Sequence, residues 1–297
     1  MAKIIECVPN ISSADEAVVQ AVANEVRATP GATLLDTSSD ENHNRSVITF
    51  VGDPAGAEEA AVRLAKAAAK LIDLTKHKGG HPRMGAVDVI PFIPIRDTTM
   101  AECVALSKRA GRRIYAEAGI PVFLYEASAS AQNRVNLASI RKGQFEGMAE
   151  KVQLPEWEPD FGGRKIHPTA GVVAVGARAP LIAFNINLST SDVTIADRIA
   201  RIVRYSGGGL SCVKAIGVLL KDRNVAQVSI NMTNYCETPL YRVVEFVRFE
   251  AARYGVHVTG TEIVGLVPMR ALIDSAEYYL GIENFEAEKQ VLEYRLD

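Results

Sequence analysis

The order in which apolar and amphipathic segments follow one another constrains this chain most, because the same order occurs twice. Short apolar or alternating runs over residues 3–8, 33–37, 46–51 and 87–95 predict strands, and helical spacing predicts helices between them. Residues 181–264 repeat the order strand, helix, strand, strand, helix, strand. The sequence therefore predicts an α+β protein with two tandem ferredoxin-like β-α-β-β-α-β subdomains, each with two helices on one face of an antiparallel sheet.

Local signals predict helix starts and the boundary between the repeats. Ser13 with Glu16, and Thr99 with Glu102, have the spacing of capping boxes that begin helices. Residues 142–165 are punctuated by Gly and Pro and sustain no period, so we predict irregular backbone there. We expect an N-terminal subdomain of residues 1–179 and a C-terminal subdomain of residues 180–297.

Composition limits the classes of partner. The 48% hydrophobic content is ample for buried cores, and a formal net charge of −2 gives no reason to expect nucleic acid or an anionic membrane surface. The sequence shows no targeting segment and no apolar stretch long enough to cross a bilayer, so we expect a cytoplasmic protein. The four cysteines show no CxxC spacing, so the sequence suggests neither a zinc ribbon nor a disulfide framework.

Chemistry is concentrated in the stretch HKGGHPRMGAVDV, residues 77–89, where a polar loop leads into a predicted strand. His77 and His81 are four residues apart, but the glycines between them and Pro82 after them disfavour a helix. A zinc pair of the metalloprotease type therefore loses its geometric basis, and we expect no metal.

His81 is the candidate general acid or base in this loop, with Lys78 and Arg83 in a rim that attracts anions. Two alternative interpretations of the loop remain open. One is a surface turn with incidental histidines, and the other is a metal site.

Short motifs also occur in order along nearly the whole chain. They are ECVPN at residues 6–10, LLD at 34–36, NR at 44–45, TFVG at 49–52, LIDL at 71–74, HKGGHPRMGAVDV at 77–89, APLIAFNINL at 179–188, VAQVS at 225–229 and IVGLVP at 263–268. Together they resemble the glutamate formimidoyltransferase family. The resemblance implies transfer of a formimidoyl group from N-formimidoylglutamate to N5 of tetrahydrofolate, a co-substrate, with His81 as the catalytic residue.

The resemblance also implies a folate site. In the segment GGRKIHPTAG, residues 162–171, Gly162, Pro168 and Gly171 match the family's folate loop, and Gly208 matches another folate-contacting glycine. Glycines let backbone amides approach a planar ligand closely, although glycine clusters also mark ordinary flexible loops. Lys78 and Arg83 are candidates for holding substrate carboxylates or are solvated loop charges. Asp36 and Asp40 are weaker candidates for orienting the imidazole.

The sequence departs from the family pattern at Ser12 to Ala14, Ser38 and Ala170. These departures leave open a formimidoylglycine donor or a reaction on 5-formyltetrahydrofolate, and a non-catalytic folate-binding protein is the alternative from another class. Family precedent favours a homodimer. No cyclodeaminase segment follows in this sequence, so we expect a separate cyclodeaminase to process the product.

Overall fold

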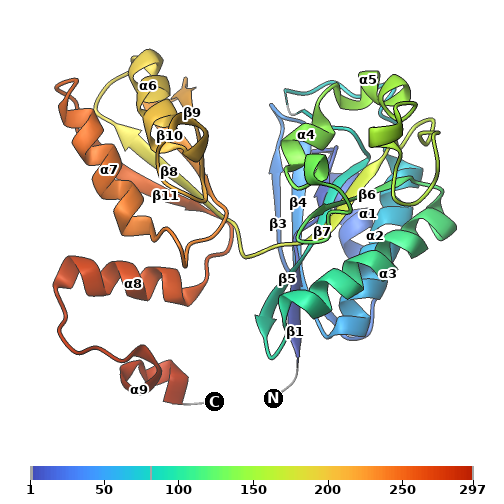
Figure 1. The fold of residues 1–297 in the computed structure, drawn as a ribbon, viewed down its shortest axis with the longest axis horizontal. Coiled ribbons are helices and arrows are strands. Elements are labelled where there is room, and N and C mark those ends of the chain that lie inside the picture. Colours follow the sequence, from blue (N-terminus) through green and yellow to red (C-terminus); the bar gives the residue numbers. More distant parts are fainter. Residues whose placement is uncertain (1–2, 81, 296–297) are drawn as a thin grey trace. The chain divides into compact units, whose positions relative to one another are not determined.

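The computed structural model describes residues 3–80 and 82–295, and its contacts divide the chain into two compact units, Met1–Ala179 and Pro180–Asp297. Each unit contains one sheet with helices packed on it (Figure 1). The α+β class and the tandem ferredoxin-like arrangement are confirmed, because both units contain the same four-stranded order.

The N-terminal unit begins with the predicted order of elements. These are β1 (Ile4–Cys7), β2 (Asn10–Ile11), α1 (Glu16–Arg27), β3 (Ala32–Asp40), β4 (Arg45–Gly52), α2 (Pro54–Leu71) and β5 (Val87–Arg96). Strand β1 falls within the first predicted strand, β2 lies beyond its predicted end at residue 8, and both pair with β4 and β5. With β3 beside β4, the first strand lies between the third and the fourth, and every pairing is antiparallel.

Two further strands extend this sheet beyond the ferredoxin-like core. The chain continues through α3 (Met100–Ala118), β6 (Val122–Glu126), η1 (Gln132–Arg134), α4 (Leu137–Arg141), α5 (Gln144–Lys151), η2 (Pro155–Trp157) and β7 (Val173–Ala177). Strand β7 runs parallel to β5, and β6 runs parallel to β7. The sequence pattern did not predict β7. Both of its partner strands lie more than forty residues earlier in the chain, and local periodicity carries no signal for such pairing.

Two local predictions need correction. Helix α1 begins at Glu16 with Asp15 as its N-cap, whose side chain accepts from the amides of Ala17 and Val18, so the predicted Ser13 cap is wrong. Residues 142–165 are not irregular throughout, because they contain α5, a two-turn helix that starts after Gly143 in a left-handed conformation (φ 95°). The Thr99–Glu102 capping box at the start of α3 is confirmed.

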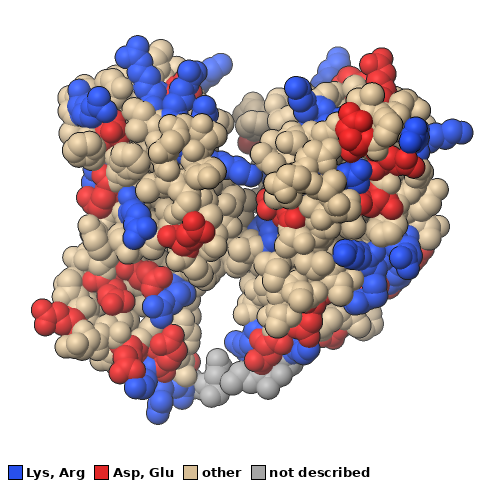
Figure 2. All heavy atoms as spheres, in the orientation of Figure 1, with Lys and Arg blue, Asp and Glu red and all other residues tan. Residues whose placement is uncertain are grey.

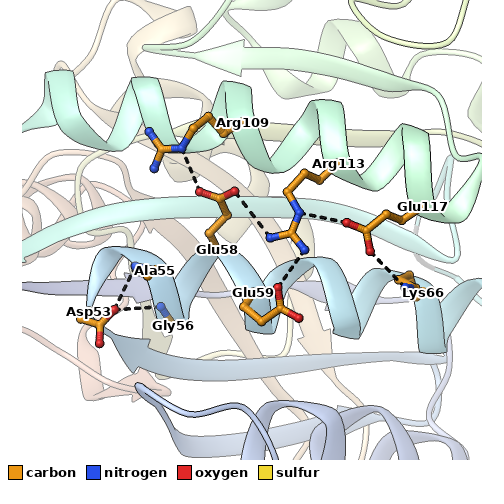
Figure 3. Close-up of polar contacts among 9 residues, drawn as sticks. All are labelled: Asp53, Ala55, Gly56, Glu58, Glu59, Lys66, Arg109, Arg113 and Glu117. Carbon is orange, nitrogen blue, oxygen red and sulfur yellow. Dashed lines mark hydrogen bonds and ion pairs between the residues drawn. The ribbon is translucent and has the colours of Figure 1, made fainter.

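Small side chains and ion pairs hold the helices of this unit together. Helix α2 buries a row of alanines, which lets it lie close to its neighbours: Ala57, Ala60, Ala61, Ala65 and Ala68. Between α2 and α3, Arg113 of α3 pairs with Glu59 of α2 at 2.8 Å and with Glu117 of its own helix at 2.9 Å, while Arg109 pairs with Glu58 of α2 at 2.9 Å (Figure 3). Helices α1 to α3 thus bury one face of the sheet in the main core.

The opposite face of strands β5, β6 and β7 has its own apolar cluster. Buried side chains of these strands, including Phe123 and Tyr125, pack with Ile140 and Met148 from α4 and α5. The segment predicted to be irregular therefore serves as a cover for this end of the sheet.

The C-terminal unit repeats the core order with the strand sequence β11-β8-β10-β9, all antiparallel. Its elements are β8 (Ile182–Leu188), α6 (Val193–Val203), η3 (Tyr205–Gly207), β9 (Val213–Leu220), β10 (Val225–Met232), α7 (Leu240–Ala252), β11 (Val258–Val264), α8 (Met269–Leu280), α9 (Ala287–Gln290) and η4 (Leu292–Arg295). Alternate side chains of the strands pack against α6 and α7 in one core.

Charges of both signs are interspersed on the face of each unit seen in Figure 2. No helix within residues 3–80 and 82–295 combines the length and the apolar character needed to span a membrane.

Candidate functional site

The loop singled out in the sequence connects α2 to β5 and is tied to the turn between β3 and β4. The amide of Gly80 donates to the Asn42 carbonyl at 3.1 Å, and Asn44 Nδ2 donates to the Lys78 carbonyl at 2.9 Å. A Cβ on Gly79 would lie 2.4 Å from the His43 carbonyl oxygen, so only glycine allows this approach. His81, the predicted catalytic residue, lies outside the described residues.

Asn44 is the hub of this contact. Its backbone is left-handed (φ 47°), a conformation that Asn adopts more readily than most residues. Its Oδ1 accepts from the amide of Ala14 at 2.9 Å while its Nδ2 binds the loop. One amide side chain therefore joins the start of the chain, the β3–β4 turn and the loop.

His77 and Arg83 fix the base of the loop from inside. His77 Nε2 lies 3.1 Å from the Asn44 carbonyl oxygen, and Arg83 Nε donates to His77 Nδ1 at 3.1 Å. Because a carbonyl only accepts and a guanidinium only donates, His77 is the neutral tautomer with its hydrogen on Nε2. His77 therefore acts as a bridge in the loop.

Arg83 is buried and fully engaged by the protein. Its two terminal nitrogens donate to Glu146 at 2.9 and 2.6 Å, and Nη1 also reaches Gln144 Oε1 at 3.1 Å. The interpretation as a solvated loop charge is wrong, because the Arg83 side chain is only 8% exposed. The hydrogen bonds that Arg83 donates to the Glu146 carboxylate stabilise its charged form and lower the pKa of Glu146.

A second buried pair lies where the loop enters β5. Asp88 Oδ1 accepts from the amide of Met84 at 2.9 Å, and Asp88 Oδ2 accepts from Arg141 Nε at 2.7 Å. The Asp88 side chain is 2% exposed. This carboxylate thus fixes the segment that follows residue 81 to helix α4.

The predicted folate loop lies directly against the same segment. The Ala86 amide donates to the Ala170 carbonyl at 3.0 Å, and the Val172 amide donates to the Met84 carbonyl at 3.1 Å. Gly171 is left-handed (φ 65°), which explains its glycine without a ligand. The structure therefore brings together two motifs that are about eighty residues apart in sequence.

Gly162 and Pro168 line a cavity of about 470 Å³ beside the C-terminal end of α3. Its lining includes Tyr115, Arg164, Lys165 and His167. His167 Nδ1 accepts from the amide of Ala170 at 2.9 Å, and burial lowers the pKa of His167 below its usual value. The cavity thus combines an aromatic ring, two cations and a fixed imidazole.

The remaining candidates are less closely connected to the loop. Asp40 Oδ2 contacts His43 Nδ1 at 2.7 Å; partial burial raises the pKa of Asp40, but hydrogen bonds from His43 outweigh it and lower the pKa overall. Asp36 lies in β3 opposite Thr49, and Lys78 is exposed. Gly208 belongs to the C-terminal unit, where it ends η3 with φ 88°, and nothing lies within 4 Å of the position that a Cβ would take.

Among residues 3–80 and 82–295, no group of three His, Cys, Asp or Glu side chains is placed to hold a metal ion.

Comparison with known proteins gives the family. Residues 4–178 match the formiminotransferase domain, N-terminal subdomain, and residues 183–296 match the formiminotransferase domain. The chain belongs to this formiminotransferase family. It is 57% identical to "Glutamate formimidoyltransferase" of Streptococcus pyogenes serotype M1, over 100% of this chain and 99% of the relative, and 46% identical to the protein of that name from Thermoplasma acidophilum, over 99% and 97%.

A longer member of the formiminotransferase family is "Formimidoyltransferase-cyclodeaminase" of Dictyostelium discoideum. It is 44% identical over 100% of this chain, and the match covers 56% of that relative.

Sequence reasoning missed the part that several residues play in holding this formiminotransferase loop in place. Asn44, His77, Asp88, Arg141 and Glu146 all act through partners distant in sequence. The family motifs include three of these residues, Asn44 in NR and His77 and Asp88 in the motif of residues 77–89, whereas Arg141 and Glu146 lie in none of the motifs.

Two departures from the family pattern have structural explanations. Ser12 Oγ donates to the Gly85 carbonyl at 2.8 Å, so this altered segment contacts the backbone that follows the loop. Ala170 is fully buried in the main core, where a larger aromatic side chain would need a different packing.

Proposed function

We propose that this protein transfers the formimidoyl group of N-formimidoyl-L-glutamate to N5 of tetrahydrofolate. The observation that carries the proposal is the 57% identity, over the full length, to a relative named glutamate formimidoyltransferase. The tied loop of residues 77–80 supports it, because a positioned acid or base needs a rigid support.

The chemistry proposed for His81 is general acid and base catalysis. N5 of tetrahydrofolate attacks the amidine carbon of the donor and forms a tetrahedral intermediate. His81 takes the proton lost by N5 and returns it to the departing glutamate nitrogen. An unperturbed imidazole titrates near ~6.5, so it can accept and release a proton within one turnover at neutral pH.

We further propose that folate binds along the loop that contains Gly162, Pro168 and Gly171. Gly208 is also proposed as a folate-contacting residue, on the family pattern alone. The cavity beside Gly162 supports this proposal, since Arg164 and Lys165 suit an anionic tail and Tyr115 offers an aromatic face. Asp36 and Asp40 are proposed to act as supporting residues only.

The test is transfer from N-formimidoylglutamate to tetrahydrofolate by the purified protein and by His81→Ala, following the 5-formimidoyl product. We expect activity in the wild type and a loss of at least ~100-fold in the variant, the size typical of an acid or base. His257→Ala is the matched control, because His257 is an exposed histidine in the other unit. A fully active His81→Ala would refute the catalytic assignment.

A second donor is favoured by one observation. The segment Ser12 to Ala14, which differs from the family pattern, binds the Gly85 carbonyl through Ser12 and the Asn44 side chain, which holds the loop, through the Ala14 amide. Formimidoylglycine, or a formyl group of 5-formyltetrahydrofolate, is therefore the next substrate to test if the glutamate donor is inactive. Folate binding without transfer of any of these groups would instead indicate a non-catalytic folate-binding protein.

The proposal includes a cytoplasmic homodimer whose product is processed by a separate cyclodeaminase. The family relative named formimidoyltransferase-cyclodeaminase supports the second part, because the match to this chain covers only 56% of it. Light scattering would test the dimer, and the purified protein should release 5-formimidoyltetrahydrofolate without ammonia.

A further inference from the structure

Arg45 is the first residue of β4 and directly follows the hub residue Asn44. Its guanidinium is largely buried, and Nη2 donates to Asn10 Oδ1. Its Nε is buried and has no hydrogen-bond partner within residues 3–80 and 82–295. A buried polar atom without a partner is uncommon in native proteins and requires an explanation.

The carboxylates around Arg45 are already committed to other groups. Asp88 binds Arg141, and Asp40 binds His43. Within the described part of the chain, no ion pair shorter than 4.0 Å involves Arg45. Arg45 is thus short of a counter-charge of its own.

The surroundings of Arg45 destabilise its charged form relative to its neutral form. Burial, and then the nearby Arg141 guanidinium, lower the pKa of Arg45 from its usual value, and the attraction of Asp88 and Asp40 does not offset them. A buried charge without a close opposite charge destabilises a fold. Such a group is expected where a ligand supplies the missing charge, since strained electrostatics concentrate at functional sites.

The position of Arg45 relates this charge to the reacting loop. Asn44, its neighbour, holds the Lys78 carbonyl, three residues before the proposed catalytic position. Arg83, the arginine expected from sequence to hold a carboxylate, already has Glu146 on both terminal nitrogens. Arg45 is therefore the arginine next to the loop whose charge is available.

We propose that Arg45 binds a carboxylate of the amino-acid donor and so positions its formimidoyl group beside the loop of residues 77–80. This inference rests on the proposed function, because it assumes an N-substituted amino-acid donor. Arginine suits the role, since its planar fork matches a carboxylate with two hydrogen bonds. The glutamyl tail of folate presents the same carboxylate chemistry, and the test separates the two sources.

The kinetic test uses Arg45→Gln, whose shorter amide can still donate toward Asn10. We expect the KM for the formimidoyl amino acid to rise by about 10- to 100-fold, as for loss of a charge-assisted hydrogen bond, with the KM for tetrahydrofolate nearly unchanged. Arg109→Gln is the control with the same charge change, at an exposed arginine on α3. A rise confined to the KM for tetrahydrofolate would assign Arg45 to the folate tail and overturn the proposal.

A binding test needs no turnover. N-formyl-L-glutamate, without tetrahydrofolate, should raise the melting temperature of the wild type and of Arg109→Gln but not of Arg45→Gln. Equal protection of all three proteins would overturn the proposal, as would a purely structural role in which Arg45→Gln melts earlier and loses affinity for both substrates alike.

The two tests also separate this inference from the proposed function. If protection depends on Arg45 but no transfer occurs, the carboxylate site stands and the reaction is wrong. If transfer occurs and Arg45→Gln keeps the wild-type KM values, the reaction stands and the role of Arg45 is wrong.

Discussion

Gly171 and Met84 lie so close that no side chain fits between them: a Cβ on Gly171 would be 2.2 Å from the Met84 carbonyl oxygen. The same carbonyl accepts from the Val172 amide at 3.1 Å. Since Met84 follows the proposed catalytic position by three residues, a change at Gly171 displaces both loops of the site. The glycine that sequence comparison assigns to folate thus also has a role within the protein.

Gly171→Ala should therefore reduce both stability and transfer activity. The left-handed conformation alone costs about 1–3 kcal/mol for such a residue, and the collision with Met84 adds to it. Gly163→Ala is the matched control, because Gly163 is also left-handed (φ 65°) but has nothing within 4 Å of its Cβ. Urea unfolding of both variants measures the difference, and equal losses would show that the contact with Met84 is unimportant.

Asn44→Ala should loosen the loop of residues 77–80. The change removes the bonds to the Ala14 amide and the Lys78 carbonyl, and we expect a loss of roughly 1–3 kcal/mol and faster hydrogen exchange at Gly80. Asn42→Ala is the matched control. Asn42 binds the Gly80 amide through its main-chain carbonyl, so this change should leave that hydrogen bond intact. Unchanged exchange at Gly80 in Asn44→Ala would contradict the hub role.

His167 should make stability fall in mild acid. Burial lowers the pKa of folded His167 below the unfolded value near ~6.5, so the unfolded chain takes up the proton first. The contribution is fully present above pH ~6.5 and is lost as pH falls through the folded pKa. From pH 8 to pH 5, the free energy of unfolding should decline less in His167→Asn, whose Oδ1 can replace Nδ1 as acceptor, than in the wild type. The same decline in both proteins would contradict the role of His167.

The Arg134–Asp160 pair should be far more important to stability than a surface pair nearby. The two side chains are 8% and 10% exposed and lie 2.7 Å apart, so Asp160→Asn leaves a buried arginine without its partner, at a cost of roughly 3–5 kcal/mol. Glu158→Gln breaks the pair with Arg164, whose side chains are 46% and 45% exposed, and should cost at most about 1 kcal/mol. Thermal denaturation compares them directly.

The sequence predicted what depends on neighbours along the chain. The two repeats of strands and helices follow from local periodicity, and the α3 cap at Thr99 follows from a four-residue signal. At α1 the same kind of signal failed, because Asp15 lies closer to the free amides of the first turn than Ser13 does.

The site was predictable only in outline. The motif containing His81 marked the loop, but the side chains that fix it act over long separations: Arg83 and Glu146 are 63 residues apart, and Arg141 and Asp88 are 53 apart. No periodicity encodes such pairs, because they depend on how α4 and α5 fold over the sheet. For the same reason the sequence suggested Arg83 as a free cation, although Glu146 occupies it.

The position of β7 in the sheet determines when the N-terminal unit can fold during synthesis. Strand β7 is the last strand of that unit to be synthesised, yet it lies between β5 and β6 and joins them. Until the ribosome has translated Val173 to Ala177, β6 lacks the strand with which it pairs, and its apolar side chains stay exposed to solvent. The N-terminal half therefore completes its folding only when translation has nearly reached the second unit, and a nascent chain stalled before that strand exposes an edge prone to aggregation.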